Sequence, residues 1–204
     1  MSENSATRSS SLTDAAPIAL ALFGFTLALY GVRYAAGVEV TVGLNYALLV
    51  SGVAEIVCGV LCLVKGLAYP GYVLGTFGFW VVGLFLLLTS GVGAPGFTPD
   101  AIAWYVLVMV VPTVYLAIPA FVYRNLPFMV AFTAITALIL SLGFGTMVGS
   151  ATLTRASGWL ALLGAVAIWY VGAGDILRNC GVLSAKGTAP AAEEPAPYTV
   201  AAAS

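Results

Sequence analysis

The chain has 204 residues, of which 61% are hydrophobic and only 7% are charged, and its formal net charge at pH 7 is -1. A water-soluble domain cannot have this balance because its surface must be polar, so most of the chain is expected to lie in lipid. The small net charge argues against a nucleic-acid partner. Because the chain has no histidine, the usual catalytic base and the commonest metal ligand are missing. We therefore expect neither an enzyme nor a metal site or cofactor.

Six apolar runs follow a polar N-terminal segment, 1–13, which is rich in Ser and Thr and predicts a disordered tail. The runs are 17–34, 44–64, 71–90, 101–123, 127–149 and 157–177. Each is near the roughly 20 residues that a helix needs to cross a bilayer. An Ala- and Pro-rich segment, 181–204, predicts a second disordered tail. The expected fold class is an all-α polytopic membrane protein, with six transmembrane helices in one domain at 14–180.

Basic residues near the ends of the runs predict the orientation. One side of the membrane would hold Arg8, Lys65, Arg124, Arg178 and Lys186, and the other side Arg33 and Arg155. Cytoplasmic loops carry the excess of Lys and Arg, so both termini are expected in the cytoplasm of a cell-membrane protein.

Prolines and glycines predict the shape and the packing of the helices. Pro112 and Pro119 lie inside the fourth run and should bend that helix. Glycines recur at helix-packing spacings, as small residues do where helices approach closely in membranes. The pairs are Gly24 and Gly31, Gly52 and Gly59, Gly71 and Gly75, and Gly145 and Gly149.

Glu55 is a carboxyl group in the middle of the run 44–64. An ionisable side chain in hydrocarbon costs at least about 2.5–3.5 kcal/mol, so it usually faces a cavity, a proton path or a bonded partner. Two interpretations stay open: a pore-lining group that couples transport to protons, or a protonated group bonded between helices or protomers. Thr26, Thr76 and Thr136, also at mid-helix positions, are candidate hydroxyl donors to a solute on this path.

Four segments together resemble the acetate uptake transporter family, which includes the succinate–acetate permeases. They are 14–20 (DAAPIAL, similar to NPAPLGL at the first helix), 51–59 (SGVAEIVCG, similar to GGLAQxxAG), 65–80 (KGLAYPGYVLGTFGFW, similar to KGNTFGxTAFxSYGxFW) and 157–177 (SGWLALLGAVAIWYVGAGDIL, similar to AGWxGLxxGxxAIYLAxxEVL). Asp14, Ala16 and Pro17 occupy the signature at the first helix. Asp14 replaces the leading Asn of that signature, and Glu55 replaces a Gln of the second segment.

The resemblance implies a six-helix protomer that encloses its own narrow pore and assembles as a homohexamer. It also implies transport of acetate and related small monocarboxylates, with succinate as a further family substrate, in a proton-coupled or channel-like manner. The hydrophobic constriction of the family falls on Phe23, Phe77 and Ile135, which would close a narrow pore by dewetting. Ordinary helix packing is the alternative for these three side chains. An acid at position 55 suits coupling to protons but repels an anion when it is ionised.

Two other functions stay open on the sequence. A six-helix amide or urea channel also encloses a narrow apolar pore, and an intramembrane Glu would suit the N–H donors of an amide. A membrane scaffold without transport activity would pack its helices without leaving a pore.

Overall fold

The computed structural model describes residues 15–180, 182 and 183. The predicted tails, 1–13 and 181–204, fall outside the described residues except for these last two positions. The described part contains α1 (Ala16–Ala36), α2 (Thr41–Val64), α3 (Ala68–Thr89), α4 (Pro99–Val108), α5 (Val110–Val122), α6 (Leu126–Met147) and α7 (Ala151–Asn179). Because α4 and α5 are two parts of one apolar span, these helices give six candidate membrane spans. The predicted all-α, multi-pass membrane fold is therefore confirmed.

The fourth span is interrupted at Met109, where α4 ends and α5 begins. Pro112 has no N–H to donate to the carbonyl of Val108, and its ring crowds that carbonyl, so the helix cannot continue regularly through this turn. Beside the break, the Met109 carbonyl accepts both the backbone N–H and the hydroxyl of Thr113, at 3.1 and 2.7 Å. The interruption lies near one of the two predicted bends, whereas Pro119 lies within α5 without ending it.

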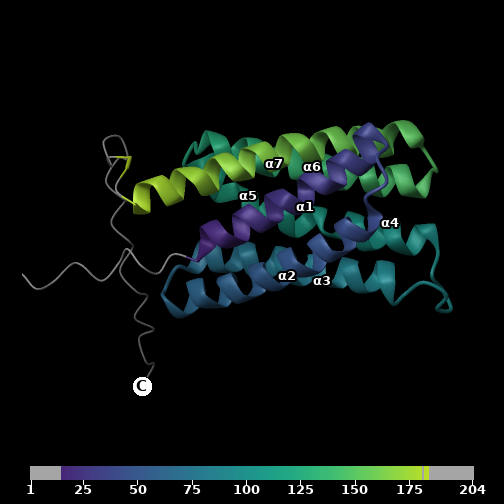
Figure 1. Cartoon of the computed structure of the whole chain (residues 1–204), viewed down its shortest axis with the longest axis horizontal. Helices are drawn as coiled ribbons and strands as arrows, with labels where there is room; N and C mark the ends of the chain where they lie inside the picture. Colours follow the sequence, from purple (N-terminus) through teal and green to yellow (C-terminus); the bar gives the residue numbers. More distant parts are fainter. Residues whose placement is uncertain (1–14, 181, 184–204) are drawn as a thin grey trace, which may run out of the picture.

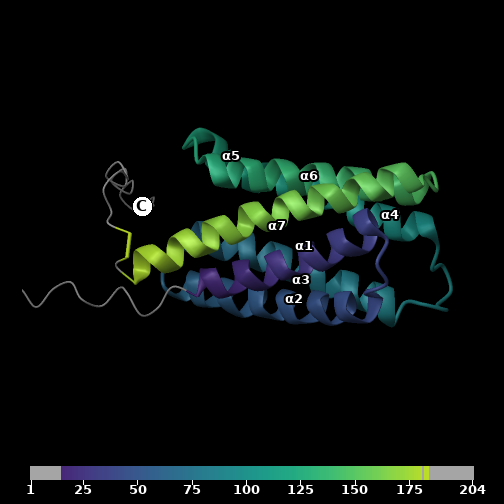
Figure 2. The ribbon, with the colours of Figure 1, turned by 45° about the horizontal axis from the view of Figure 1, so that its top comes forward.

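The helices form a ring when the bundle is viewed along its length. Helix α1 packs against α2 and α7, α2 against α3, α7 against α6, and α6 against both α4 and α5. In Figures 1 and 2, α2 and α3 lie on one side of α1, whereas α6 and α7 lie on the other. Large apolar side chains such as Val57, Tyr72 and Phe79 are exposed on the outside of the bundle, as contact with lipid requires.

Glycines bring α2 and α3 into backbone contact. A Cβ at Gly59 would lie 2.8 Å from the backbone nitrogen of Gly75, and a Cβ at Gly78 would lie 2.8 Å from the carbonyl oxygen of Gly52. Such distances leave no room for a larger residue without a shift of the helices. The close packing that the glycine spacing predicts is thus confirmed for this pair of helices.

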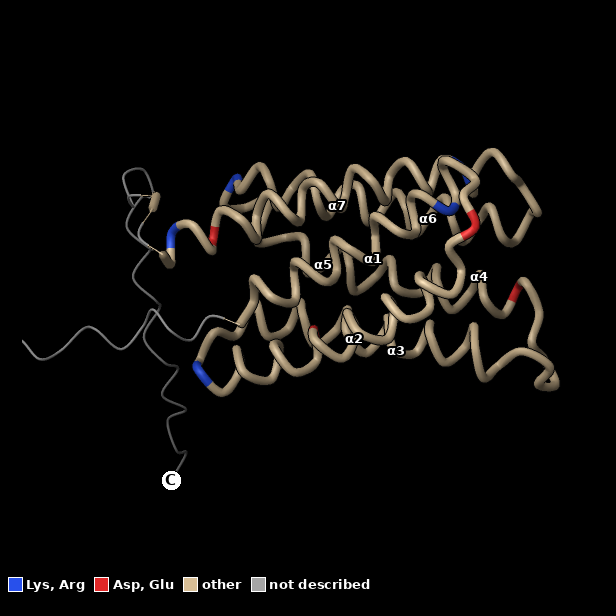
Figure 3. The backbone as a smooth tube through the Cα atoms, viewed as in Figure 1, with Lys and Arg blue, Asp and Glu red and all other residues tan. Residues whose placement is uncertain are grey.

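Charged residues gather toward the two ends of the described bundle, apart from one acidic position within its length, which is Glu55 on α2 (Figure 3). We call the end where α1 begins and α7 ends the terminal end, and the opposite end the far end. Lys65 follows α2 and Arg178 lies in the last turn of α7, both at the terminal end, whereas Arg33 lies in the last turn of α1, at the far end. The membrane face on which the terminal end lies stays a prediction.

Candidate functional site

A small cavity lies inside the ring of helices. Its volume is about 30 Å³, and side chains from α1, α2, α3, α6 and α7 line it. The lining residues are Leu20, Phe23, Glu55, Val73, Leu74, Phe77, Phe128, Ala131, Phe132, Ile135 and Ile168. The structure therefore brings Phe23, Phe77 and Ile135 together with Glu55, although these four residues come from four different helices.

Aromatic rings pack across the ring of helices at this level. The centroid of the Phe77 ring lies 5.8 Å from that of Phe23 on α1 and 6.4 Å from that of Phe132 on α6. Phe132 in turn stacks on Phe128, at 6.5 Å. The side chains of Phe23, Phe77, Phe132 and Ile135 are all buried. These contacts run from α1 through α3 to α6 beside the small cavity.

Glu55 is the titratable residue among the lining side chains of this cavity. It is only 1% exposed, and its Oε2 atom has no hydrogen-bond partner among the described residues. Its Cβ lies close to the neighbouring helix, since a Cβ added at Gly78 of α3 would lie 2.9 Å from the Cβ of Glu55. Buried polar groups in proteins normally have a partner. An unpartnered carboxyl oxygen beside a cavity is therefore a position at which a molecule in the cavity can form a hydrogen bond.

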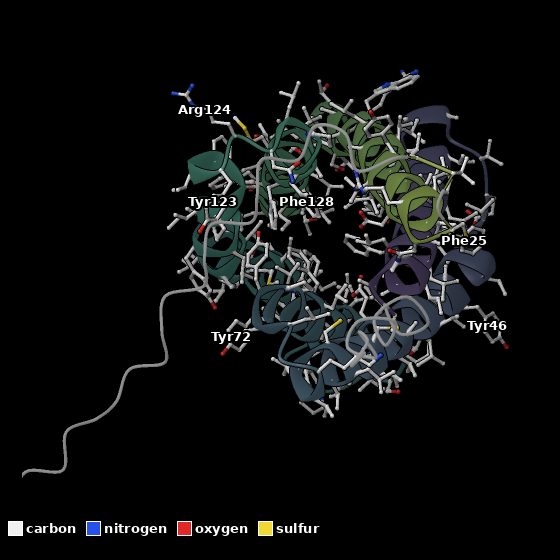
Figure 4. The ribbon with its side chains drawn as sticks, turned by 90° about the vertical axis from the view of Figure 1, so that its left-hand side faces the viewer. Phe25, Tyr46, Tyr72, Tyr123, Arg124 and Phe128 are labelled. Carbon is white, nitrogen blue, oxygen red and sulfur yellow. The ribbon has the colours of Figure 1, made fainter. Side chains whose placement is uncertain are left out.

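A wider vestibule opens at the terminal end of the bundle. Its volume is about 500 Å³, and it shares Leu20, Val73, Leu74 and Phe128 with the small cavity, so the two spaces adjoin. Its other lining residues are Ala16, Tyr69, Pro70, Pro119, Ala120, Tyr123, Asn125 and Asp175. Figure 4 views the bundle from this end and shows Phe128 on the inner side of the ring, whereas Phe25, Tyr46 and Tyr72 lie at its rim.

A hydrogen bond at the vestibule joins α3 to α5, two helices that have few other contacts with each other. The hydroxyl group of Tyr69, in the first turn of α3, donates to the carbonyl of Leu116 on α5 at 2.7 Å. Polar groups at the mouth include Asn125 and Asp175, and the Asp175 carboxylate pairs with Arg178 one turn further along α7. The vestibule thus has a polar mouth, and its floor is the apolar set of residues that it shares with the small cavity.

Only two of the three predicted signature residues at the first helix lie within the described part of the chain. Ala16 lines the vestibule and Pro17 is buried in the first turn of α1. Asp14 lies outside the described residues.

The structure does not bring the three predicted threonines to the cavity. The hydroxyl of Thr26 joins α1 to α2, at 2.9 Å from both the Ala47 carbonyl and the Ser51 hydroxyl. Thr136 donates to the carbonyl of Phe132 within its own helix and lines a different, more open groove between α5 and α6. Thr76 is half-buried on α3 and is not among the lining residues of the cavity or the vestibule.

Several lining residues are absent from the sequence-based hypotheses. Phe128 and Phe132 lie four residues apart on α6, with Ile135 three residues further, so all three share one face of that helix. That spacing is a signal which sequence reasoning can use once Ile135 is assigned to the pore. No comparable spacing in the sequence indicates that Ile168 on α7 lines the cavity.

Comparisons with known proteins agree with this architecture. The sequence model of the GPR1/FUN34/yaaH family matches residues 2–184. Curated protein sequences gave no match. Among solved structures, that of the bacterial acetate channel SatP matches with a TM-score of 0.74, covering 83% of this chain and 94% of the other, at 20% sequence identity. Identity at that level shows a shared fold, and the family match confirms the resemblance predicted from the sequence. The chain belongs to the GPR1/FUN34/yaaH family.

Proposed function

We propose that this chain carries acetate and related small monocarboxylates across the cell membrane through a pore within each protomer. The observation that carries the proposal is the small cavity, where a buried, unpartnered carboxyl group meets the three side chains of the expected constriction. The vestibule supports a solute entrance at the terminal end. The likeness in fold to an acetate channel supports the class of solute.

The constriction selects by size and by polarity. A carboxylate that leaves the vestibule must lose most of its water, because the closed cavity measures about 30 Å³ and one water needs roughly 10–15 Å³. The rings of Phe23 and Phe77 favour the methyl end of acetate, and an apolar lining of this width closes the pore by dewetting. Succinate would have to place its second carboxylate among these rings, so we expect it to pass more slowly than acetate.

Glu55 makes passage depend on a proton. A protonated Glu55 donates a hydrogen bond to a carboxylate, whereas an ionised Glu55 repels it, and repulsion between like charges is strong away from water. The other lining residues of the cavity are apolar and do not titrate. A proton on Glu55 or on the solute is therefore required for the two to meet, so passage depends on pH at this carboxyl group.

Assembly and orientation complete the proposal. We expect a homohexamer, as the family resemblance implies, with a pore in every protomer. We also expect both termini in the cytoplasm, which places the vestibule on the cytoplasmic side.

Uptake of labelled acetate into proteoliposomes tests the proposal. The protein should give uptake above that of protein-free liposomes, rising as the pH falls, after correction for acetic acid that crosses lipid unaided. Succinate should enter more slowly. A folded, correctly inserted protein that carries no monocarboxylate at any pH would overturn the proposal and leave the amide channel and the scaffold as the alternatives.

A further inference from the structure

We infer that the cavity at Glu55 also admits a second class of solute, small neutral primary amides such as acetamide. The inference rests on the proposed function, since both classes of solute would use the same pore. The feature that carries it is an Oε2 atom without a partner, on a side chain 1% exposed, in a cavity whose other lining residues are apolar.

Water alone is a poor occupant of this cavity. A buried water normally makes two to four hydrogen bonds to polar groups, but the lining side chains offer a single carboxyl group and otherwise aliphatic and aromatic carbon. A molecule with a polar group at one end and a methyl group at the other fits both parts of the lining. Acetic acid and acetamide share that shape.

The carboxyl group of Glu55 recognises acids and amides by the same chemistry. When protonated, it presents an O–H donor next to a carbonyl acceptor. A primary amide presents an N–H donor next to its own carbonyl, so the two groups make a pair of hydrogen bonds. When ionised, Glu55 still accepts a bond from the amide N–H, whereas it repels an acetate ion. We therefore expect acetamide passage to depend less on pH than acetate passage.

Position 55 offers a matched set of variants. Glu55→Met keeps an unbranched side chain of similar length but removes both hydrogen-bonding functions, and Glu55→Gln restores a neutral donor and acceptor. Val57→Met is the control, because Val57 lies on the same helix and is 52% exposed on the outside of the bundle. If Glu55→Met does not elute as a folded protein, Glu55→Leu replaces it.

The experiment measures the uptake of labelled acetamide and labelled acetate by the full-length protein in proteoliposomes at neutral and acidic pH. Acetamide uptake should exceed that of protein-free liposomes. It should fall about tenfold in Glu55→Met, as expected when a buried polar group of the solute loses its partner. It should return to most of its original rate in Glu55→Gln.

The outcomes separate this inference from the proposed function. Acetate uptake without acetamide uptake would overturn the amide inference alone. Acetamide uptake that is equal in Glu55→Met and in the Val57→Met control would overturn the role of Glu55 as its partner. Uptake of neither solute by the folded protein would overturn the proposed function and, with it, this inference.

Discussion

Replacing Phe77 by Ala should open the constriction at a moderate cost in stability. The Phe77 side chain is buried, and its ring centroid lies 5.8, 6.3 and 6.4 Å from those of Phe23, Trp80 and Phe132. At about 0.5–1.5 kcal/mol for each aromatic pair, these contacts amount to roughly 1.5–4.5 kcal/mol. Phe-to-Ala changes in protein cores cost a comparable amount, about 3–5 kcal/mol. We therefore expect a folded variant with a lower unfolding temperature.

The same substitution should change transport. If the constriction limits the rate, each 1.4 kcal/mol removed from its barrier raises the rate about tenfold. We therefore expect acetate uptake to rise, and longer acids such as butyrate to enter as well. The assay compares labelled acids of increasing chain length in proteoliposomes at one fixed pH.

Phe79→Ala is the matched control for this experiment. Phe79 lies two residues from Phe77 on α3 but is 68% exposed on the outside of the bundle, so the same chemical change leaves the cavity untouched. Equal uptake and equal chain-length selectivity in folded Phe77→Ala and Phe79→Ala would refute the constriction. Phe77 would then serve ordinary helix packing.

Three further predictions concern pH, orientation and packing. Glu55→Gln fixes a neutral side chain, so acetate uptake should survive with a flatter pH profile, whereas Glu55→Asp should keep a pH response; an unaltered profile in the Gln variant would contradict proton coupling. Single cysteines at Gly96 and Ser184 should label from outside the cell only at Gly96, and external labelling at Ser184 would reverse the orientation. Gly59→Leu should lower thermal stability by about 1–3 kcal/mol through overpacking, whereas Gly43→Leu, at a position where an added Cβ meets nothing within 4 Å, should not.

The number of membrane spans could be predicted because hydropathy reports directly on contact with lipid. Helix ends could not, since a helix continues past the hydrocarbon. The last apolar run begins at 157, yet α7 begins at Ala151 and includes the charged Arg155. The break at Met109 could be predicted only in part. Pro112 predicts an irregular turn in this helix, but the residue at which the helix stops depends on which backbone carbonyls find other hydrogen-bond donors.

The position of a side chain around its helix was harder to predict than its depth. Glu55, Thr26 and Thr136 all lie deep in apolar runs, but Glu55 lines the cavity, Thr26 bonds between α1 and α2, and Thr136 faces a groove between α5 and α6. In a soluble protein the apolar face of a helix points inward. In a membrane both faces are apolar, so composition does not mark the inner one. The three residues of the expected constriction were chosen by family resemblance rather than by the pattern of residues.

The contact between Gly78 and Glu55 has a consequence for how firmly the pore holds a solute. The Glu55 side chain is 1% exposed and its Cβ lies close to the backbone of α3, so burial restricts its rotation before any solute arrives. A free side chain would lose roughly 0.5–1.5 kcal/mol of entropy when a bound solute immobilises it. Here that loss occurs when the helices pack. Gly78, which has no side chain and is not among the cavity's lining residues, leaves room for this packing, so under the proposed function the affinity for a solute would depend on how closely α2 and α3 approach.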